Sequence, residues 1–125
     1  MIYRALGVVA LSSLLHPMIV EGYAEQEYLQ VEATAYCDVG ITADGSLTRD
    51  GIIAGKREWL GKVAVIYEIR DDGMPEYLGT FEFRDTGGDR RIKDGRCIDI
   101  WMPTQEECFQ WGRRNVLIQI FDGKG

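Results

Sequence analysis

Histidine is almost absent from this chain. Its 125 residues contain one, His16, which lies in an apolar N-terminal stretch. If that stretch is removed during maturation, the remaining chain has no imidazole. A Ser-His-Asp triad, a Cys-His dyad and a histidine-ligated metal site are then excluded. The chemistry left to the chain is that of carboxylates, hydroxyls, lysine and thiols.

Cysteine is also scarce, with Cys37, Cys97 and Cys108 as its three representatives. They lack the close paired spacing of a zinc site, so we expect neither a metal nor a cofactor. In an oxidising compartment, three cysteines predict one disulfide and one free thiol. The sequence does not choose among the three pairings. We favour Cys97–Cys108, which closes the shortest loop and leaves Cys37 free.

Positive charge is neither abundant nor clustered. The chain has 14 Lys and Arg against 20 Asp and Glu, which gives a net charge of −6. It contains no run of basic residues of the kind that follows a phosphate backbone. We therefore expect no nucleic-acid partner.

The N-terminus has the pattern of a secretory signal. Arg4 precedes an apolar run, Ala5–Val20, and the small residues of Gly-Tyr-Ala, which ends at Ala24, suit a signal peptidase. The run is short for a membrane span and contains a proline. We expect residues 1–24 to be cleaved and residues 25–125 to form one secreted or cell-wall-associated domain, a monomer. The alternative is an uncleaved N-terminal segment that anchors the protein in the membrane.

The rest of the chain is patterned as short strands. Alternating or short apolar runs predict strands at Leu29–Tyr36, Ile52–Gly55, Lys62–Ile69, Tyr77–Phe83, Cys97–Met102 and Asn115–Phe121. Asp72-Gly73 is a hairpin signal between two of them. Thr104 and Glu107 form a capping-box pattern that predicts one short helix ending at Gly112. The pattern favours a single all-β domain, a closed or nearly closed barrel.

Asp85-Thr86-Gly87 resembles the Asp-Thr-Gly motif of aspartic proteases, and the later Trp-Gly-Arg-Arg-Asn resembles the closing strand of their retroviral type. A single-chain protease needs a second such motif to share a proton between two carboxylates, and none is present. The dimeric type needs a hairpin flap between the two segments. The interval between Asp85 and Gly112 holds 26 residues, part of them the predicted helix. We therefore reject this interpretation.

A different set of motifs covers most of the chain. In order these are Val-Glu-Ala-Thr-Ala-Tyr, Gly-Ile-Ile-Ala-Gly, Asp-Thr-Gly-Gly followed by Ile-Lys-x-Gly, Ile-Asp-Ile-Trp, and Trp-Gly-Arg-Arg before a strand. Together they resemble the 3D (three-aspartate) domain of bacterial cell-wall proteins such as membrane-bound lytic transglycosylase A and the stationary-phase-survival muralytic factors. The resemblance implies a six-stranded double-psi β-barrel with one short helix. It also implies that peptidoglycan glycan strands are the partner.

The resemblance assigns roles to two aspartates. Asp85 matches the second of the family's three, and Asp99 matches the last, the acid/base of such transglycosylases. The first has no counterpart, because Gly55 and Lys56 stand where it belongs. One carboxyl group can suffice, since the muramyl C6 hydroxyl is the nucleophile and the same group can give and then take a proton. Strand alternation places Ile98 and Ile100 on the core face and Asp99 beside Trp101 on the other.

Further residues are candidates for substrate binding. Tyr36 and Thr34 lie on the polar face of the first strand, and Trp101 can stack on a sugar. Thr86 is expected to orient Asp85 through its hydroxyl. Gly87 would let the backbone come close to the substrate, and Lys93 would bind a carboxylate of the substrate. Two functions remain open: a peptidoglycan lytic transglycosylase, favoured by Asp85 and Asp99, and a non-catalytic glycan-binding or wall-loosening module of expansin or barwin type, favoured by the missing aspartate.

Overall fold

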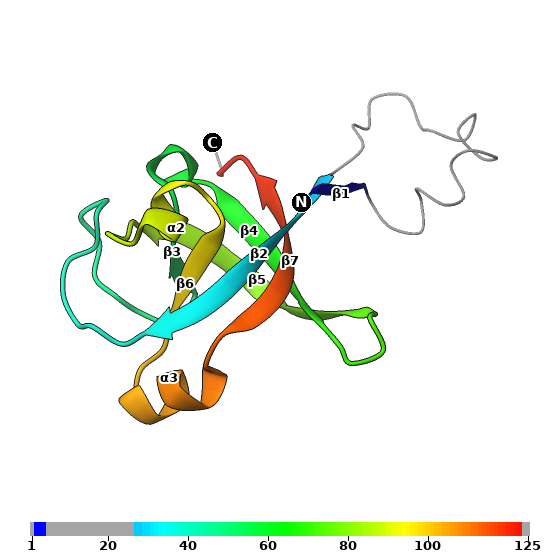
Figure 1. Ribbon diagram of the computed structural model, residues 1–125. Helices are drawn as coiled ribbons and strands as arrows, with labels where there is room; N and C mark the ends of the chain where they lie inside the picture. The colour runs from blue at the N-terminus through cyan, green and yellow to red at the C-terminus, as the bar shows by residue number, and fades with distance from the viewer. Residues whose placement is uncertain (1, 5–26, 124–125) are drawn as a thin grey trace.

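The computed structural model describes residues 2–4 and 27–123 (Figure 1). The predicted signal segment and its cleavage site lie outside the described residues, except for the short strand β1 (Ile2–Arg4). This strand pairs antiparallel with the beginning of β2 (Glu27–Tyr36). In the described ranges, no helix has the length and apolarity needed to cross a membrane.

Six strands close into a barrel. After β2 come β3 (Ile52–Ala54), β4 (Val63–Ile69), β5 (Pro75–Asp85), β6 (Cys97–Trp101) and β7 (Arg114–Phe121). The order around the barrel is β2-β6-β3-β5-β4-β7, and β7 pairs back with β2. The β2–β6 and β3–β5 pairs are parallel, and the other pairs within the barrel are antiparallel. The predicted all-β barrel and each of its six strands are confirmed, with ends that differ by a few residues.

The core fills the barrel with alternating side chains from every strand. Val31 and Ala33 of β2 and Val116 and Ile118 of β7 alternate along their strands and are buried. The remaining strands add further buried apolar side chains to the same cluster: Ile53, Ala64, Ile66, Phe83, Ile98 and Ile100. With this face committed to the core, the opposite faces of β2, β6 and the end of β5 are left to carry the polar residues.

The predicted helix is α3 (Gln105–Trp111), between β6 and β7. The Thr104 hydroxyl accepts a hydrogen bond from the Glu107 backbone N–H at 3.1 Å, as a helix cap should. Gly112 ends the helix with a φ of 67°, which favours glycine. Trp111 is buried, and its indole N–H donates to the Ala33 carbonyl of β2 at 2.9 Å. It therefore belongs to the core.

Two further short helices correct the prediction of a single one. They are the 3-10 turn η2 (Arg57–Trp59) and α2 (Arg90–Lys93). Each is about one turn long, too short for apolar periodicity to show. The Asp89 side chain caps α2 by accepting from the Arg91 backbone N–H at 2.8 Å. The Asp-Arg-Arg sequence therefore carried a local signal that the pattern of apolar residues did not.

Candidate active site

Two aspartates lie on neighbouring parts of one face of the barrel because of strand register. Ala54 of β3 pairs with Asp85 of β5 on one side and with Asp99 of β6 on the other. Asp99 in turn pairs with Thr34 of β2. Residues paired across strands point to the same side of a sheet. Asp85, Asp99 and Thr34 therefore share a face, with the small Ala54 between the two carboxylates.

A β-bulge brings Asp85 into this row. The β3–β5 register runs from Ile53 opposite Phe83 to Ala54 opposite Asp85, so Arg84 is the extra residue. Without the bulge, Arg84 would lie opposite Ala54 and the carboxylate would point elsewhere. Bulges commonly redirect a side chain beside a functional site.

Asp99 is a partly buried carboxyl group with a single hydrogen-bond donor. The Thr34 hydroxyl donates to its Oδ1 atom at 2.9 Å, and Oδ2 has no hydrogen-bond partner among the described residues. Burial raises the pKa of Asp99, the Thr34 hydrogen bond opposes that rise, and the negative charges of Asp38 and Asp85 add to it. Ile98 and Ile100 are buried, so the predicted division of β6 into a core face and a polar face is confirmed.

Asp85 is held differently, by three donors. The Tyr36 hydroxyl donates to its Oδ2 atom at 2.9 Å. The backbone N–H groups of Thr86 and Ala43 donate to Oδ1 at 2.9 and 3.0 Å. Burial, together with the neighbouring Asp85, raises the pKa of Tyr36 far above its usual range, so this phenol keeps its proton and donates it. Both oxygens of Asp85 are therefore fixed in place.

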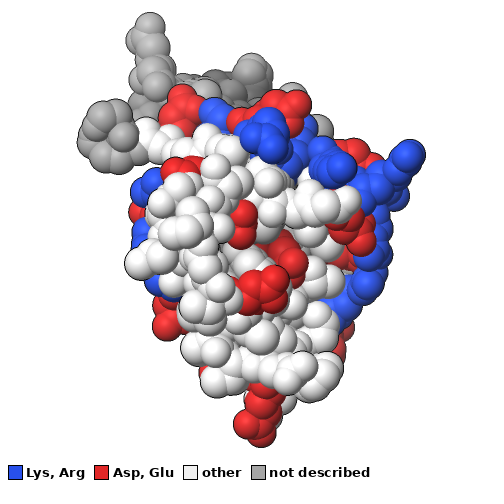
Figure 2. Space-filling model, turned by 90° about the vertical axis from the view of Figure 1, so that its left-hand side faces the viewer, with Lys and Arg blue, Asp and Glu red and all other residues white. Residues whose placement is uncertain are grey.

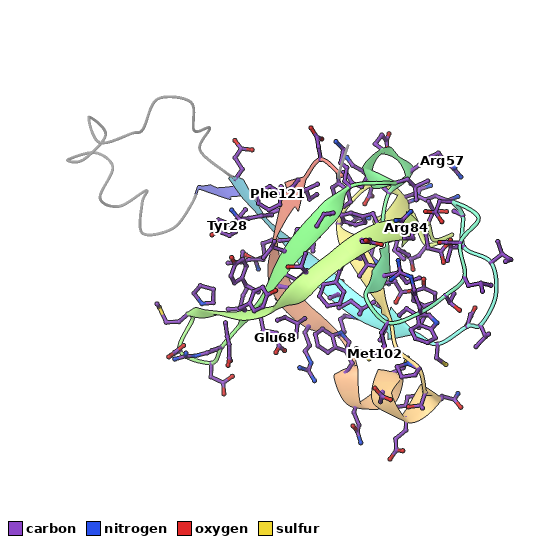
Figure 3. The ribbon with its side chains drawn as sticks, turned by 180° about the vertical axis from the view of Figure 1, so that it is seen from behind. Tyr28, Arg57, Glu68, Arg84, Met102 and Phe121 are labelled. Atoms are coloured by element: carbon purple, nitrogen blue, oxygen red, sulfur yellow. The ribbon has the colours of Figure 1, made fainter. Side chains whose placement is uncertain are left out.

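The segment 37–51, between β2 and β3, closes over this part of the barrel. The Trp101 indole N–H donates to the Asp38 carbonyl at 2.7 Å, and Ala43 reaches Asp85. Arg84, labelled in Figure 3, forms an ion pair with Asp44 at 2.9 Å. Asp38 and Ala43 are parts of the site that the residue pattern did not predict. The available signal was the aspartate- and glycine-rich composition of a segment that directly follows Tyr36.

The side of the molecule on which the 37–51 segment lies carries acidic side chains near its middle (Figure 2). Figure 2 views the side on which the 37–51 segment lies. Acidic side chains gather near the middle of a mostly uncharged surface, while Lys and Arg follow its upper and right-hand margins. A nucleic-acid backbone would be repelled from such a centre.

Other predicted residues take different roles or places. Thr86 contacts Asp85 through its backbone N–H, and its hydroxyl makes no hydrogen bond in the described part of the chain. Gly87 provides packing room, because a Cβ atom there would lie 2.7 Å from Ile92 of α2. Lys93 lines an open cavity of about 520 Å³ with Gly88, Arg90 and Asp94, and neither aspartate of the site lines that cavity.

The structure does not bring the predicted disulfide partners Cys97 and Cys108 together. All three cysteines are free thiols, and Cys97 is buried at the start of β6, with its thiol against the Ile98 carbonyl at 3.3 Å. Cys108 lies on α3, beyond the opposite end of that strand, where its thiol interacts with that of Cys37. A five-residue strand is about 13 Å long, so β6 keeps the predicted partners apart.

Gly55, at one of the two positions where the 3D-domain resemblance leads us to expect the first aspartate, has no room for a side chain. A Cβ atom on Gly55 would lie 2.6 Å from the ring of Phe83, which is fully buried, and 3.1 Å from Trp59. Lys56, the next residue, places its ammonium group over the Trp59 ring, 5.0 Å from its centre. Close packing therefore leaves no space for a larger side chain at Gly55.

No family model, curated protein or solved structure matches the chain. Function must be inferred from the residues and geometry of this site. What the site offers is a carboxyl group of raised pKa with one free oxygen, a second carboxylate held by three donors, and two hydroxyl groups that orient them.

The packing of Gly55 predicts a stability difference between two glycine substitutions. Gly55→Ala should lower the free energy of unfolding by about 1–3 kcal/mol, since the Phe83 ring cannot move without disturbing the core. Gly88→Ala is the matched control, because nothing lies within 4 Å of its added Cβ atom. Urea denaturation measures both. Equal stability of the two variants would contradict the close contact at Gly55.

The environment of Asp99 predicts pKa shifts of opposite sign in two variants. Thr34→Val removes the hydrogen bond that lowers the pKa of Asp99, so that pKa should rise further. Asp38→Asn removes a negative charge that raises it, so the pKa should fall. The carboxyl carbon resonance of Asp99, followed by NMR from pH 2 to 9, measures the three values. A wild-type pKa at or below the ordinary aspartate value of about 3.9 would refute the assigned environment.

Proposed function

We propose that the chain is an exported peptidoglycan-cleaving enzyme, a lytic transglycosylase of the 3D-domain type that breaks the muramyl–glucosaminyl bond. The observation that carries the proposal is Asp99, a partly buried carboxyl group whose raised pKa and free Oδ2 atom suit proton transfer. The proposal includes a double-psi arrangement of the barrel. The two parallel strand pairs, β2–β6 and β3–β5, support it.

The proposed reaction uses Asp99 twice. Protonated Asp99 gives its proton to the glycosidic oxygen, and the bond from that oxygen to the muramyl C1 breaks. The ionised Asp99 then takes the proton of the muramyl C6 hydroxyl as the C6 oxygen bonds to C1. The products are a free glucosaminyl hydroxyl and a 1,6-anhydromuramyl end, and the carboxyl group regains its proton. A raised pKa supports the first step, because Asp99 must hold a proton at the working pH.

The neighbouring residues are assigned supporting roles in this reaction. Thr34 fixes Oδ1 of Asp99, which directs the free Oδ2 to the substrate. Asp85 is fixed by Tyr36 and two backbone N–H groups. Its negative charge raises the pKa of Asp99 and stabilises the positive charge that develops at C1. The Trp101 indole N–H donates to the Asp38 carbonyl, and the ring is the proposed stacking surface for a sugar.

The second candidate is a glycan-binding or wall-loosening module without catalysis. Gly55 favours it, because the packed Phe83 ring leaves no room for the first of the family's aspartates. A hydrolase with two carboxylates on opposite sides of the bond is less well supported. In this site Asp85 and Asp99 each pair with Ala54, so both carboxylates lie on one face of the sheet with a single alanine between them.

Product analysis separates these functions. Purified peptidoglycan is incubated with the protein and the soluble fragments are identified by mass spectrometry. We expect anhydromuramyl ends, and Asp99→Asn should reduce their release by about 10⁴-fold or more, since both proton transfers use this group. Circular dichroism and glycan pull-down provide the controls for folding and binding. Reducing ends would indicate a hydrolase, unchanged strands would leave the binding module, and an active Asp99→Asn variant would refute the acid/base assignment.

Asp85→Asn should shift the pH dependence of cleavage. Activity is expected to fall as pH rises through the pKa of Asp99, because the acid loses its proton. Removing the negative charge of Asp85 lowers that pKa, so the high-pH limb should move to lower pH while the loss of activity stays smaller than in Asp99→Asn. Initial rates measured between pH 4 and 9 test this. A limb that moved upward would contradict the electrostatic role of Asp85.

A further inference from the structure

Two of the three cysteines are neighbours although 70 residues separate them in the chain. Cys37 directly follows β2, and Cys108 lies in the middle of α3. The Cys37 thiol lies close enough to that of Cys108 to influence its pKa, and both residues are partly exposed. Burial, followed by the adjacent Cys37, raises the pKa of Cys108.

Two hydrogen bonds hold α3 against β2, one just before the helix and one at its last residue. Before the helix, the Met102 backbone N–H donates to the Tyr36 carbonyl at 2.8 Å. Figure 3 labels Met102 where β6 leads into α3. At the end of the helix, the indole of Trp111 donates to the Ala33 carbonyl at 2.9 Å. These bonds attach α3 to β2, so the fold places Cys108 of the helix near Cys37, which follows the last residue of β2.

We propose that Cys37 and Cys108 are a disulfide site that forms by exchange with a low-molecular-weight disulfide of the glutathione type. One cysteine thiolate attacks a sulfur of the oxidant, and one thiol leaves. The second cysteine thiolate then attacks the mixed disulfide, which forms the Cys37–Cys108 bond and releases a second thiol. Two cysteine thiols are oxidised and one external disulfide is reduced to two thiols. This inference is independent of the proposed catalytic function.

The bond would lock the border of the candidate site. Cys37 begins the 37–51 segment, whose Ala43 contacts Asp85, and it follows Tyr36, which contacts the same carboxylate. A bond to α3 joins this segment, the end of β2 and the helix into one unit. It also closes a long loop, so it restricts the unfolded chain and raises the melting temperature.

Cys97 is excluded from the exchange by its surroundings. It is 2% exposed, and its thiol lies against the Ile98 carbonyl at 3.3 Å and the Thr34 hydroxyl at 3.7 Å. Burial raises its pKa, so the buried thiol stays protonated at neutral pH. An oxidant that reaches Cys37 and Cys108 in the folded protein therefore leaves Cys97 reduced.

The test treats the folded chain with oxidised glutathione and maps its peptides without reduction. We expect a Cys37–Cys108 peptide, and Cys97 that alkylates after unfolding. Oxidation should raise the melting temperature by about 10 °C or more in the wild type and in Cys97→Ala. Cys37→Ser and Cys108→Ser should show no such rise, and their reduced melting temperatures establish that they are folded.

Three results would overturn the inference. The first is a bond that includes Cys97. The second is stable glutathione adducts or interchain dimers in place of the intrachain bond. The third is a rise in melting temperature that persists in Cys37→Ser. None of these measurements depends on peptidoglycan cleavage, so a failed activity assay and a failed disulfide assay are distinguishable.

Discussion

The pairing of β3 with both β5 and β6 is the constraint on which the site depends. The strand is three residues long and fully buried, and Ala54 at its end contacts the two strands that carry the aspartates. Register in a sheet is discrete, and a slip of one residue would turn every side chain to the other face. The core residues Ile53, Phe83 and Ile100 prevent such a slip, because it would expose them. The hydrophobic core therefore determines where the carboxylates lie.

The same row of residues gives two identical side chains different properties. Asp99 has one hydroxyl donor and loses solvation, and burial raises its pKa. Asp85, separated from it by Ala54, accepts hydrogen bonds from a phenol and two backbone N–H groups. Pairs of carboxyl groups whose environments differ in this way are typical of acid–base sites. This contrast, more than the presence of aspartates, supports a catalytic function over simple glycan binding.

The sequence predicted those features that depend on neighbours along the chain. Alternation located the six strands and the two faces of β6, and the Thr104 cap located α3. Features set by contacts between distant residues were not predictable in this way. The bulge at Arg84, the reach of Ala43 to Asp85 and the meeting of Cys37 with Cys108 depend on register and closure. The shortest loop favoured a Cys97–Cys108 bond, but the length of β6 separates these two residues.

Closure of the barrel by β2 and β7 has a consequence for how the chain acquires its structure. Leu29 of β2 pairs with Ile118 of β7, so this edge of the first barrel strand stays unpaired until the last strand is in place. Contacts between such distant residues make folding slow, because a long loop must close before the contacts stabilise it. An incomplete chain emerging from the ribosome would lack β7 and could not complete the barrel.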